Sequence, residues 1–106
     1  MSKYTIRPRS YQVAKQLGVK IAPSKREFKK IDVYFPVKGK PKTFRYKFSV
    51  GDNRYLDYHM WKTFEQRKKV PPGTAEKRRR AYIVRHNKDL SVKNSKGFFA
   101  YRLLWY

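Results

Sequence analysis

The sequence predicts a small single α+β domain in which an antiparallel β-hairpin packs against two or three helices. Two stretches alternate apolar and polar residues as half-buried strands do, and two others place apolar residues at helical spacing between proline and glycine stops. Aromatic residues make up 17% of the 106 positions, which is enough for a modest core. We expect a basic N-terminal arm with a short helix over residues 1–30 and the α+β domain over residues 31–106.

The N-terminal arm is predicted to contain little regular structure. Ser10 is a suitable N-cap for a helix from Tyr11 to Leu17, which Gly18 closes. Residues 19–22 are expected to be extended, and residues 23–30 to form a polar loop or flexible arm. The start of the chain lacks the apolar run of a secretory signal peptide.

The hairpin is predicted over residues 31–50, around the loop sequence KGKPK. One antiparallel register sets every apolar residue of the first strand against an apolar residue of the second. Residues directly opposite each other on antiparallel strands point to the same face, so this register gathers eight apolar side chains on one face. The predicted pairs are Ile31 with Val50, Val33 with Phe48, Phe35 with Tyr46, and Val37 with Phe44.

The other face of the hairpin and its loop are basic. Arg45 and Lys47 are expected on that face beside Tyr34, and basic side chains interleaved with aromatic rings track a phosphate backbone or stack on bases. The alternative interpretation is a solvated sheet face. The candidate polyanion-binding residues of the hairpin are Lys38, Lys40, Lys42, Arg45 and Lys47.

A second helix is predicted from Arg54 to Lys69. Its apolar residues recur every four positions, which indicates a side that packs into the core rather than a ligand cage. These residues are Leu56, Met60 and Phe64, with Trp61 beside them.

A central helix is predicted from Thr74 to Asp89, where the cations are densest. Thr74 is a suitable N-cap, and Glu76 lies in the first turn, where the helix dipole favours an anion. One face carries Arg, Tyr and His in place of an apolar stripe, and such groups bind anions or lock polar networks. Alternatively, these arginines pair with the few carboxylates or are solvated. The face comprises Ala75, Arg78, Arg79, Tyr82, His86 and Asp89, with Arg85 at its border.

The C-terminal segment GFFAYRLLWY, residues 97–106, is the most apolar part of the chain. It follows a polar connection over residues 91–96. We therefore expect it to be docked on the core rather than loose.

Charge indicates the class of partner. The chain has 28 Lys and Arg against 7 Asp and Glu, a net charge of +21, and both halves are strongly positive. Nucleic acid is the natural polyanionic partner, because neutralising phosphates releases counterions without base-specific contacts. The absence of cysteine excludes disulfides, zinc ribbons and thiol catalysis, and fits a reducing intracellular compartment. No stretch reaches transmembrane length, and no motif indicates a cofactor or a small-molecule substrate.

Several motifs in the second half carry a resemblance to a family. They are Gly51-Asp52-x-Arg54, Lys77-Arg78-Arg79-Arg80-x-Tyr82, Arg85-His86-x-Lys88, Gly97-Phe98-Phe99-Ala100 and Leu103-Leu104-Trp105. In this order, the chain from Ile31 to Trp105 resembles small uncharacterised basic proteins encoded by large double-stranded DNA viruses and, more distantly, by some tailed phages. The resemblance implies a viral origin and a place in the virion, and it assigns no activity.

The shared motifs are compatible with two roles for the charged residues, one structural and one in binding. Asp52 is expected to accept a bidentate bond from an arginine of the central helix, so that Asp52, Arg79 and His86 form a structural polar network. The surplus cations of the central helix then remain for a phosphate backbone or an acidic protein surface. They are Lys77, Arg80, Arg85 and Lys88.

Three classes of function remain open. The first is a non-enzymatic structural protein of a virion, a minor capsid or internal core protein, that binds packaged DNA without sequence preference or acidic surfaces of capsid proteins. The second is a protein embedded in structured RNA, of the ribosomal type. The third is a metal-dependent nuclease, for which no pair of candidate ligands has a recognised spacing, so we expect no enzyme and no metal. Its candidate residues are Asp52, Asp57, His59, Glu65 and His86.

Overall fold

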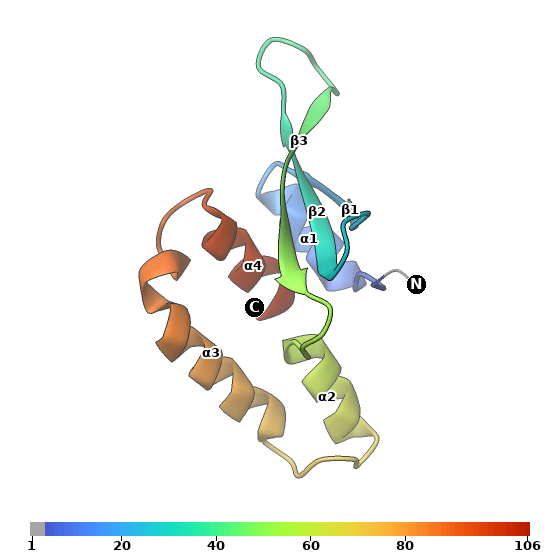
Figure 1. The fold of residues 1–106 in the computed structure, drawn as a ribbon, viewed down its shortest axis with the longest axis vertical. Coiled ribbons are helices and arrows are strands. Elements are labelled where there is room, and N and C mark those ends of the chain that lie inside the picture. Colours follow the sequence, from blue (N-terminus) through green and yellow to red (C-terminus); the bar gives the residue numbers. More distant parts are fainter. Residues whose placement is uncertain (1–3) are drawn as a thin grey trace. The chain divides into compact units, whose positions relative to one another are not determined.

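The computed structural model describes residues 4–106 and confirms the α+β class, with a three-stranded antiparallel sheet and four helices in that range (Figure 1). The chain divides into two compact units, one ending at Arg54 and one running from Tyr55 to Tyr106, and each is described by itself. The first unit holds the sheet and one helix. The second unit holds three helices.

The first unit begins with helix α1, Pro8–Gln16, and continues into strands β1 (Lys20–Pro23), β2 (Lys29–Pro36) and β3 (Phe44–Asp52), paired in the order β1-β2-β3. Part of the predicted N-terminal arm therefore belongs to the sheet. The predicted boundary after residue 30 falls inside β2, and residues 1–3 of the arm lie outside the described residues.

Helix α1 starts earlier than predicted. Arg7 is the residue at the N-cap, and Pro8 occupies the first turn, where its fixed φ suits a helix start and its missing N–H costs nothing. Ser10, predicted as the cap, lies inside the helix and is buried together with Val13 and Ala14. Gly18 takes a φ of 76° just after the helix, so its predicted role in closing the helix is confirmed.

Two of the four predicted pairs between β2 and β3 are present in the structure. Ile31 lies opposite Val50 and Val33 opposite Phe48, but a bulge follows, and the next pair is Tyr34 with Tyr46. Lys47 is the extra residue at this bulge. The predicted single surface of eight apolar side chains is therefore wrong beyond Val33, because one inserted residue moves the following side chains of a strand to the other face.

The buried residues of the first unit are mainly apolar and include residues of the strand pairs that were predicted correctly. Ile31, Val33 and Val50 are completely buried, and apolar residues of α1, of β1 and of the segments just before these two elements are buried as well. These additional core residues are Ile6, Val13, Ala14, Val19 and Ile21.

The second unit consists of α2 (Tyr58–Gln66), α3 (Thr74–Leu90) and α4 (Lys96–Leu104), with α2 packed beside α3 and α3 against α4 (Figure 1). Helix α2 is shorter than predicted at both ends. The buried carboxylate of Asp57 caps its N-terminus, accepting a bond of 3.0 Å from the backbone N–H of Met60. At its other end Lys68 has a φ of 58°, which a helix does not allow.

Helix α3 follows the prediction closely but is capped differently. Gly73, with a φ of 89°, is the N-cap residue, and the Thr74 hydroxyl instead donates to the carbonyl oxygen of Pro71 at 2.6 Å. The helix kinks at His86, whose φ and ψ of −116° and 17° are not helical.

Helix α4 confirms the docked C-terminus. Ser95 caps it, and Phe98, Phe99, Leu103, Leu104 and Trp105 are buried. The predicted stripe of α2 is less buried than a core stripe. Leu56, Met60, Trp61 and Phe64 are all half-buried.

Candidate polyanion-binding surface

The nine cations predicted to bind polyanions are all exposed. Within residues 4–106, ion pairs to carboxylates are made by other cations, and none of the nine has a carboxylate oxygen within 4.0 Å. A cation that is exposed and has no carboxylate partner keeps its charge available for an external anion. These cations form two groups, a hairpin group in the first unit and an α3 group in the second.

The hairpin group begins at a structured loop. Strand β1 ends its pairing opposite Tyr34, so β2 and β3 continue beyond it as a two-stranded ribbon that carries Lys38, Lys40 and Lys42 at its tip (Figure 1). Backbone bonds close the loop, from Val37 to Thr43 at 2.8 Å and between Lys40 and each of these two residues at 3.2 Å. The three lysines are therefore displayed on an ordered turn.

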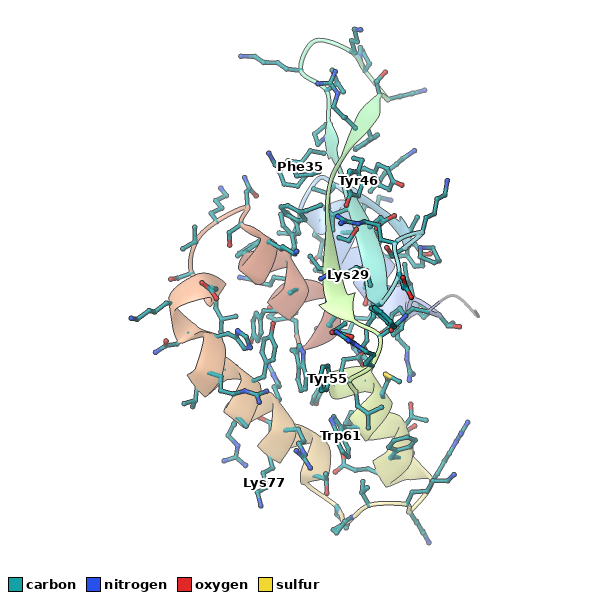
Figure 2. The ribbon with its side chains drawn as sticks, viewed as in Figure 1. Lys29, Phe35, Tyr46, Tyr55, Trp61 and Lys77 are labelled. Carbon is teal, nitrogen blue, oxygen red and sulfur yellow. The ribbon has the colours of Figure 1, made fainter. Side chains whose placement is uncertain are left out.

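The two cations of β3 lie on a different face from the one predicted. Arg45 is paired with Phe35, and the ammonium of Lys47 lies 5.9 Å from the centre of the Phe35 ring. Tyr34 lies on the opposite face with Tyr46, and Figure 2 shows Phe35 and Tyr46 on opposite sides of the strand pair. The predicted grouping of Arg45 and Lys47 beside Tyr34 is wrong, and the bulge is the cause.

The α3 group is exposed, and the outward position predicted for Arg80 and Lys88 is confirmed. Lys77, Arg80, Arg85 and Lys88 are exposed, and Figure 2 shows Lys77 on the side of α3 away from α2 and Trp61. At 100° per residue, the first three fall within one arc of the helix, and Lys88 follows beyond the kink. Ala81 and Val84, which is 74% exposed, fall within the same arc, so this side of α3 is mainly basic with two exposed apolar residues.

The inward side of α3 is held by rings rather than carboxylates. The guanidinium of Arg78 lies 4.6 Å from the Trp61 ring, and that of Arg79 lies 5.4 Å from the Tyr58 ring. A hydrogen bond to the Tyr101 side chain raises the pKa of Arg79, and Glu76 lies 3.6 Å away. Arg79 is therefore a structural cation, as expected, although its partners differ from those predicted.

The predicted partner of Asp52 is wrong. Both carboxylate oxygens of Asp52 accept bonds from Arg54, at 2.9 Å from Nε and 2.6 Å from an Nη atom. These bonds hold the pKa of the Asp52 carboxyl well below its usual range. Asp52 therefore does accept a bidentate bond from an arginine, but the donor is Arg54 in the same turn rather than an arginine of α3.

His86, the third member of the predicted network, contacts other groups. Its ring lies 4.3 Å from that of Tyr82, and its Nδ1 is 3.9 Å from a carboxylate oxygen of Asp89. Its position on the inward face is as predicted, and the kink in α3 occurs at this residue.

The candidate nuclease residues have structural partners. Asp57 caps α2, Glu65 accepts a bond from the Gly73 backbone N–H, and Asp52 is bound by Arg54. His59 lies beside the ring of Tyr58. In the described part of the chain, no three His, Asp or Glu side chains are grouped as metal ligands.

One polar cluster was missed by the sequence reasoning. Asp32 is buried in the middle of β2 and accepts bonds from the hydroxyls of Ser24 and Ser49 at 2.6 Å and 2.5 Å, and from the Lys25 backbone N–H at 3.2 Å. Burial raises the pKa of this carboxyl, but the three bonds outweigh it and hold the pKa below its ordinary value. A lone carboxylate within an apolar strand was the signal in the sequence.

Comparison with known proteins does not assign a family. No family model, curated protein sequence or solved structure matches this chain. Among residues 4–106, no helix has both the length and the apolar character needed to cross a membrane.

Proposed function

We propose that this chain is a non-enzymatic structural protein of a virion that binds polyanions, either packaged DNA or acidic surfaces of capsid proteins. One observation carries the polyanion-binding part: nine exposed cations on ordered elements lack carboxylate partners in the described structure. A protein that only needed solubility would not hold so large an unbalanced positive charge, because like charges repel each other in the folded state.

The arrangement favours binding without sequence preference. The ribbon tip and the outward side of α3 present long flexible cations to solvent, which suits phosphate oxygens rather than the hydrogen-bonding edges of bases. Binding then gains its free energy from released counterions. Acidic protein surfaces are also complementary in charge to these cations, so the acidic surface of a capsid protein is the alternative partner.

The virion part of the proposal is supported by the sequence resemblance from Ile31 to Trp105. Its test is the protein composition of purified particles of the encoding virus, measured by mass spectrometry. We expect the chain at a fixed copy number per particle. Its complete absence from purified particles would remove the virion role and leave polyanion binding standing by itself.

A second candidate is a protein embedded in folded RNA, of the ribosomal type. The observation that favours it is the two-stranded ribbon that extends past β1 with three lysines at its tip. Such a ribbon fits a groove between RNA helices, where phosphates approach from both sides. Stronger binding to a structured RNA than to a DNA duplex of equal length and at equal salt would favour this candidate.

The direct test is a set of binding isotherms on two duplexes of unrelated sequence, at several salt concentrations. We expect equal affinities and a steep fall with salt. Replacing Lys38, Lys40 and Lys42 by Gln should flatten the slope of log K against log salt by about 0.9 for each phosphate that is no longer neutralised. The comparison set Arg67, Lys69 and Lys93 has the same summed charge and is also exposed, but its members follow α2 and α3 and do not share one turn, so replacing them should change the slope less.

Two results would count against this function. Strong preference for one duplex would show base readout, and an affinity unmoved by salt would show that charge is not the driving force. We also expect no hydrolysis of DNA or RNA with magnesium, manganese or zinc present. Cleavage that is abolished in His86→Ala would show an enzyme instead.

A further inference from the structure

The outer half of one sheet face carries a small aromatic and basic surface, which we call the tyrosine patch: Tyr34, Tyr46 and Arg26. The rings of Tyr34 and Tyr46 lie opposite each other on β2 and β3, with centroids 5.9 Å apart and planes at 73°. Tyr46 is 41% exposed although it lies on a strand. Arg26 is exposed beside it, and its guanidinium donates a bond of 3.3 Å to the Tyr46 hydroxyl.

Tyr46 is held in place at its hydroxyl. This oxygen is bonded both to Arg26 and to the Ser49 hydroxyl, the latter at 2.8 Å. The bond to Ser49, followed by the bond to Arg26, lowers the pKa of Tyr46 from its ordinary value. The partly exposed ring is therefore fixed from its polar end.

The anchor of the patch is buried. The Ser49 hydroxyl, which is bonded to Tyr46, donates a hydrogen bond to the carboxylate of Asp32. This carboxylate also accepts bonds from the Ser24 hydroxyl and the Lys25 backbone N–H, and these bonds fix the turn before β2. The Arg26 backbone N–H donates to Ser24 in the same turn, at 3.0 Å. One buried carboxylate thus orders both the strand that carries Tyr46 and the turn that carries Arg26.

A fixed and exposed aromatic ring beside a cation matches the chemistry of unpaired nucleobases. Every base has a π-face that stacks on an aromatic side chain, and the flanking phosphates require positive charge. An edge-to-face pair also leaves ring surface available for a further stacking partner. Because Tyr46 is already ordered, stacking costs little additional side-chain entropy.

Positive charge surrounds the patch on the same face. Lys20 of β1 lies opposite Tyr34, and its ammonium is 5.0 Å from the ring of Phe44, which belongs to the same face of β3. The exposed Lys25 adjoins Arg26 in the turn. Phosphates next to a base stacked on the patch would therefore have cations nearby.

We propose that the tyrosine patch binds single-stranded nucleic acid, with one or more bases stacked on Tyr46 and Tyr34 and the flanking phosphates held by Arg26 and Lys20. This inference rests on the proposed polyanion binding and deepens it by naming a second mode. A duplex hides its base faces within the stack, so it engages the exposed cations alone. Single strands engage the cations and the patch together.

The test compares Tyr46→Leu with the wild type on a fluorescent oligothymidylate and on a duplex of equal charge, at one salt concentration. Tyr46→Leu should weaken single-strand binding about ten-fold, the loss expected from one stacked base, and leave duplex binding within about two-fold. Tyr46→Phe keeps the ring but removes both hydroxyl bonds, so its loss should be smaller. The matched control is Tyr55→Leu, because Tyr55 is exposed but lies in the other unit, and it should change neither affinity.

Different results would contradict polyanion binding by the protein and single-strand binding at the tyrosine patch. If the wild type binds neither oligonucleotide at low salt, polyanion binding itself is wrong. If it binds both with steep salt dependence and Tyr46→Leu binds oligothymidylate like the wild type, only the tyrosine patch is wrong. Measuring the affinity for an oligouridylate of the same length shows whether the patch prefers single-stranded RNA or DNA.

A readout on the unaltered protein covers the case in which Tyr46→Leu does not fold. Ultraviolet cross-linking of wild type to oligothymidylate, followed by mass spectrometry, should map the adduct to Tyr46 or Tyr34. Cross-links confined to other residues would overturn the inference.

Discussion

Tyr82 and Trp105 stack face to face, with ring centroids 4.7 Å apart and planes only 13° from parallel. The stack joins the middle of α3 to the residue that ends α4, and the ring of His86 lies 4.3 Å from that of Tyr82, tilted by 32°. Burial, followed by the nearby charge of Asp89, raises the pKa of Tyr82. The C-terminal segment is therefore held by a specific ring contact as well as by its buried leucines.

Trp105→Ala should destabilise the second unit by about 3–5 kcal/mol, the range for removing a large buried aromatic side chain. The measurement is chemical denaturation followed by circular dichroism. Tyr106→Ala is the matched control, since Tyr106 is the next residue and is exposed, and it should cost less than about 1 kcal/mol. A double-mutant cycle with Tyr82→Leu should give a coupling energy of about 0.5–1.5 kcal/mol, and no coupling would mean that the stack adds nothing beyond burial.

The elements with strong periodicity were predictable from the sequence. The strands of the hairpin show such periodicity, whereas the central helix was located by the residues expected at its start and the docked C-terminus by its apolar composition. The outward side of α3 was also predictable, because helical geometry alone separates Arg79 from Arg80.

The features that were predicted wrongly depend on single residues, and a single residue leaves no periodic pattern in the sequence. The bulge at Lys47 leaves the alternation of the strand intact in sequence, so the pattern cannot show that Tyr46 changes face. The start of α2 was misplaced because Asp57, Asp52 and Arg54 all suit a turn or a helix end, and only the structure shows that Asp57 is the cap. The partner of Asp52 was misassigned for the same reason: a local arginine competes with a distant one at lower entropic cost.

Gly97→Ala should destabilise the second unit by about 1–3 kcal/mol, because a methyl group at Gly97 would lie 2.5 Å from the Cβ of Asp89. Thermal melts measure the effect. Asp89→Gly removes the opposing atom, so adding Gly97→Ala in that background should be neutral or stabilising, since alanine favours a helix over glycine. A cost that persists in the Asp89→Gly background would show that this close approach is not the cause.

Asp32→Asn tests the buried anchor through its pH dependence. The pKa of Asp32 is lower in the folded state than its ordinary value of 3.8, so its contribution to stability is present above about pH 4 and is lost as pH falls through the folded-state pKa. Asp32→Asn should therefore lower the free energy of unfolding by about 1–3 kcal/mol at pH 7, and the difference from wild type should shrink at pH 3. A difference that is constant with pH would exclude the ionised carboxylate as its source. The control Glu27→Gln, at an exposed carboxylate, should stay within about 0.5 kcal/mol of wild type at pH 7.

The two sides of α3 should separate stability from binding. Arg79 has a side chain that is 27% exposed and contacts Tyr58 and Tyr101, whereas Arg80 and Lys88 are exposed. Since no buried carboxylate depends on Arg79, Arg79→Ala should cost about 1–2 kcal/mol, less than the removal of one partner from a buried ion pair. Its polyanion affinity should fall only slightly, in line with the removal of one charge.

Replacing Arg80 and Lys88 together by Gln should have the opposite effect. The melting temperature should stay unchanged or rise, because repulsion among the cations of α3 is relieved, while duplex binding weakens and its salt slope flattens by about 0.9 for each phosphate that these two cations neutralise. Thermal melts and salt-dependent isotherms on both variants decide between the two sides. If Arg79→Ala melted like wild type and bound duplex only weakly, while the double variant melted early and bound duplex like wild type, the binding side of α3 would be the one that faces Tyr58 and Tyr101.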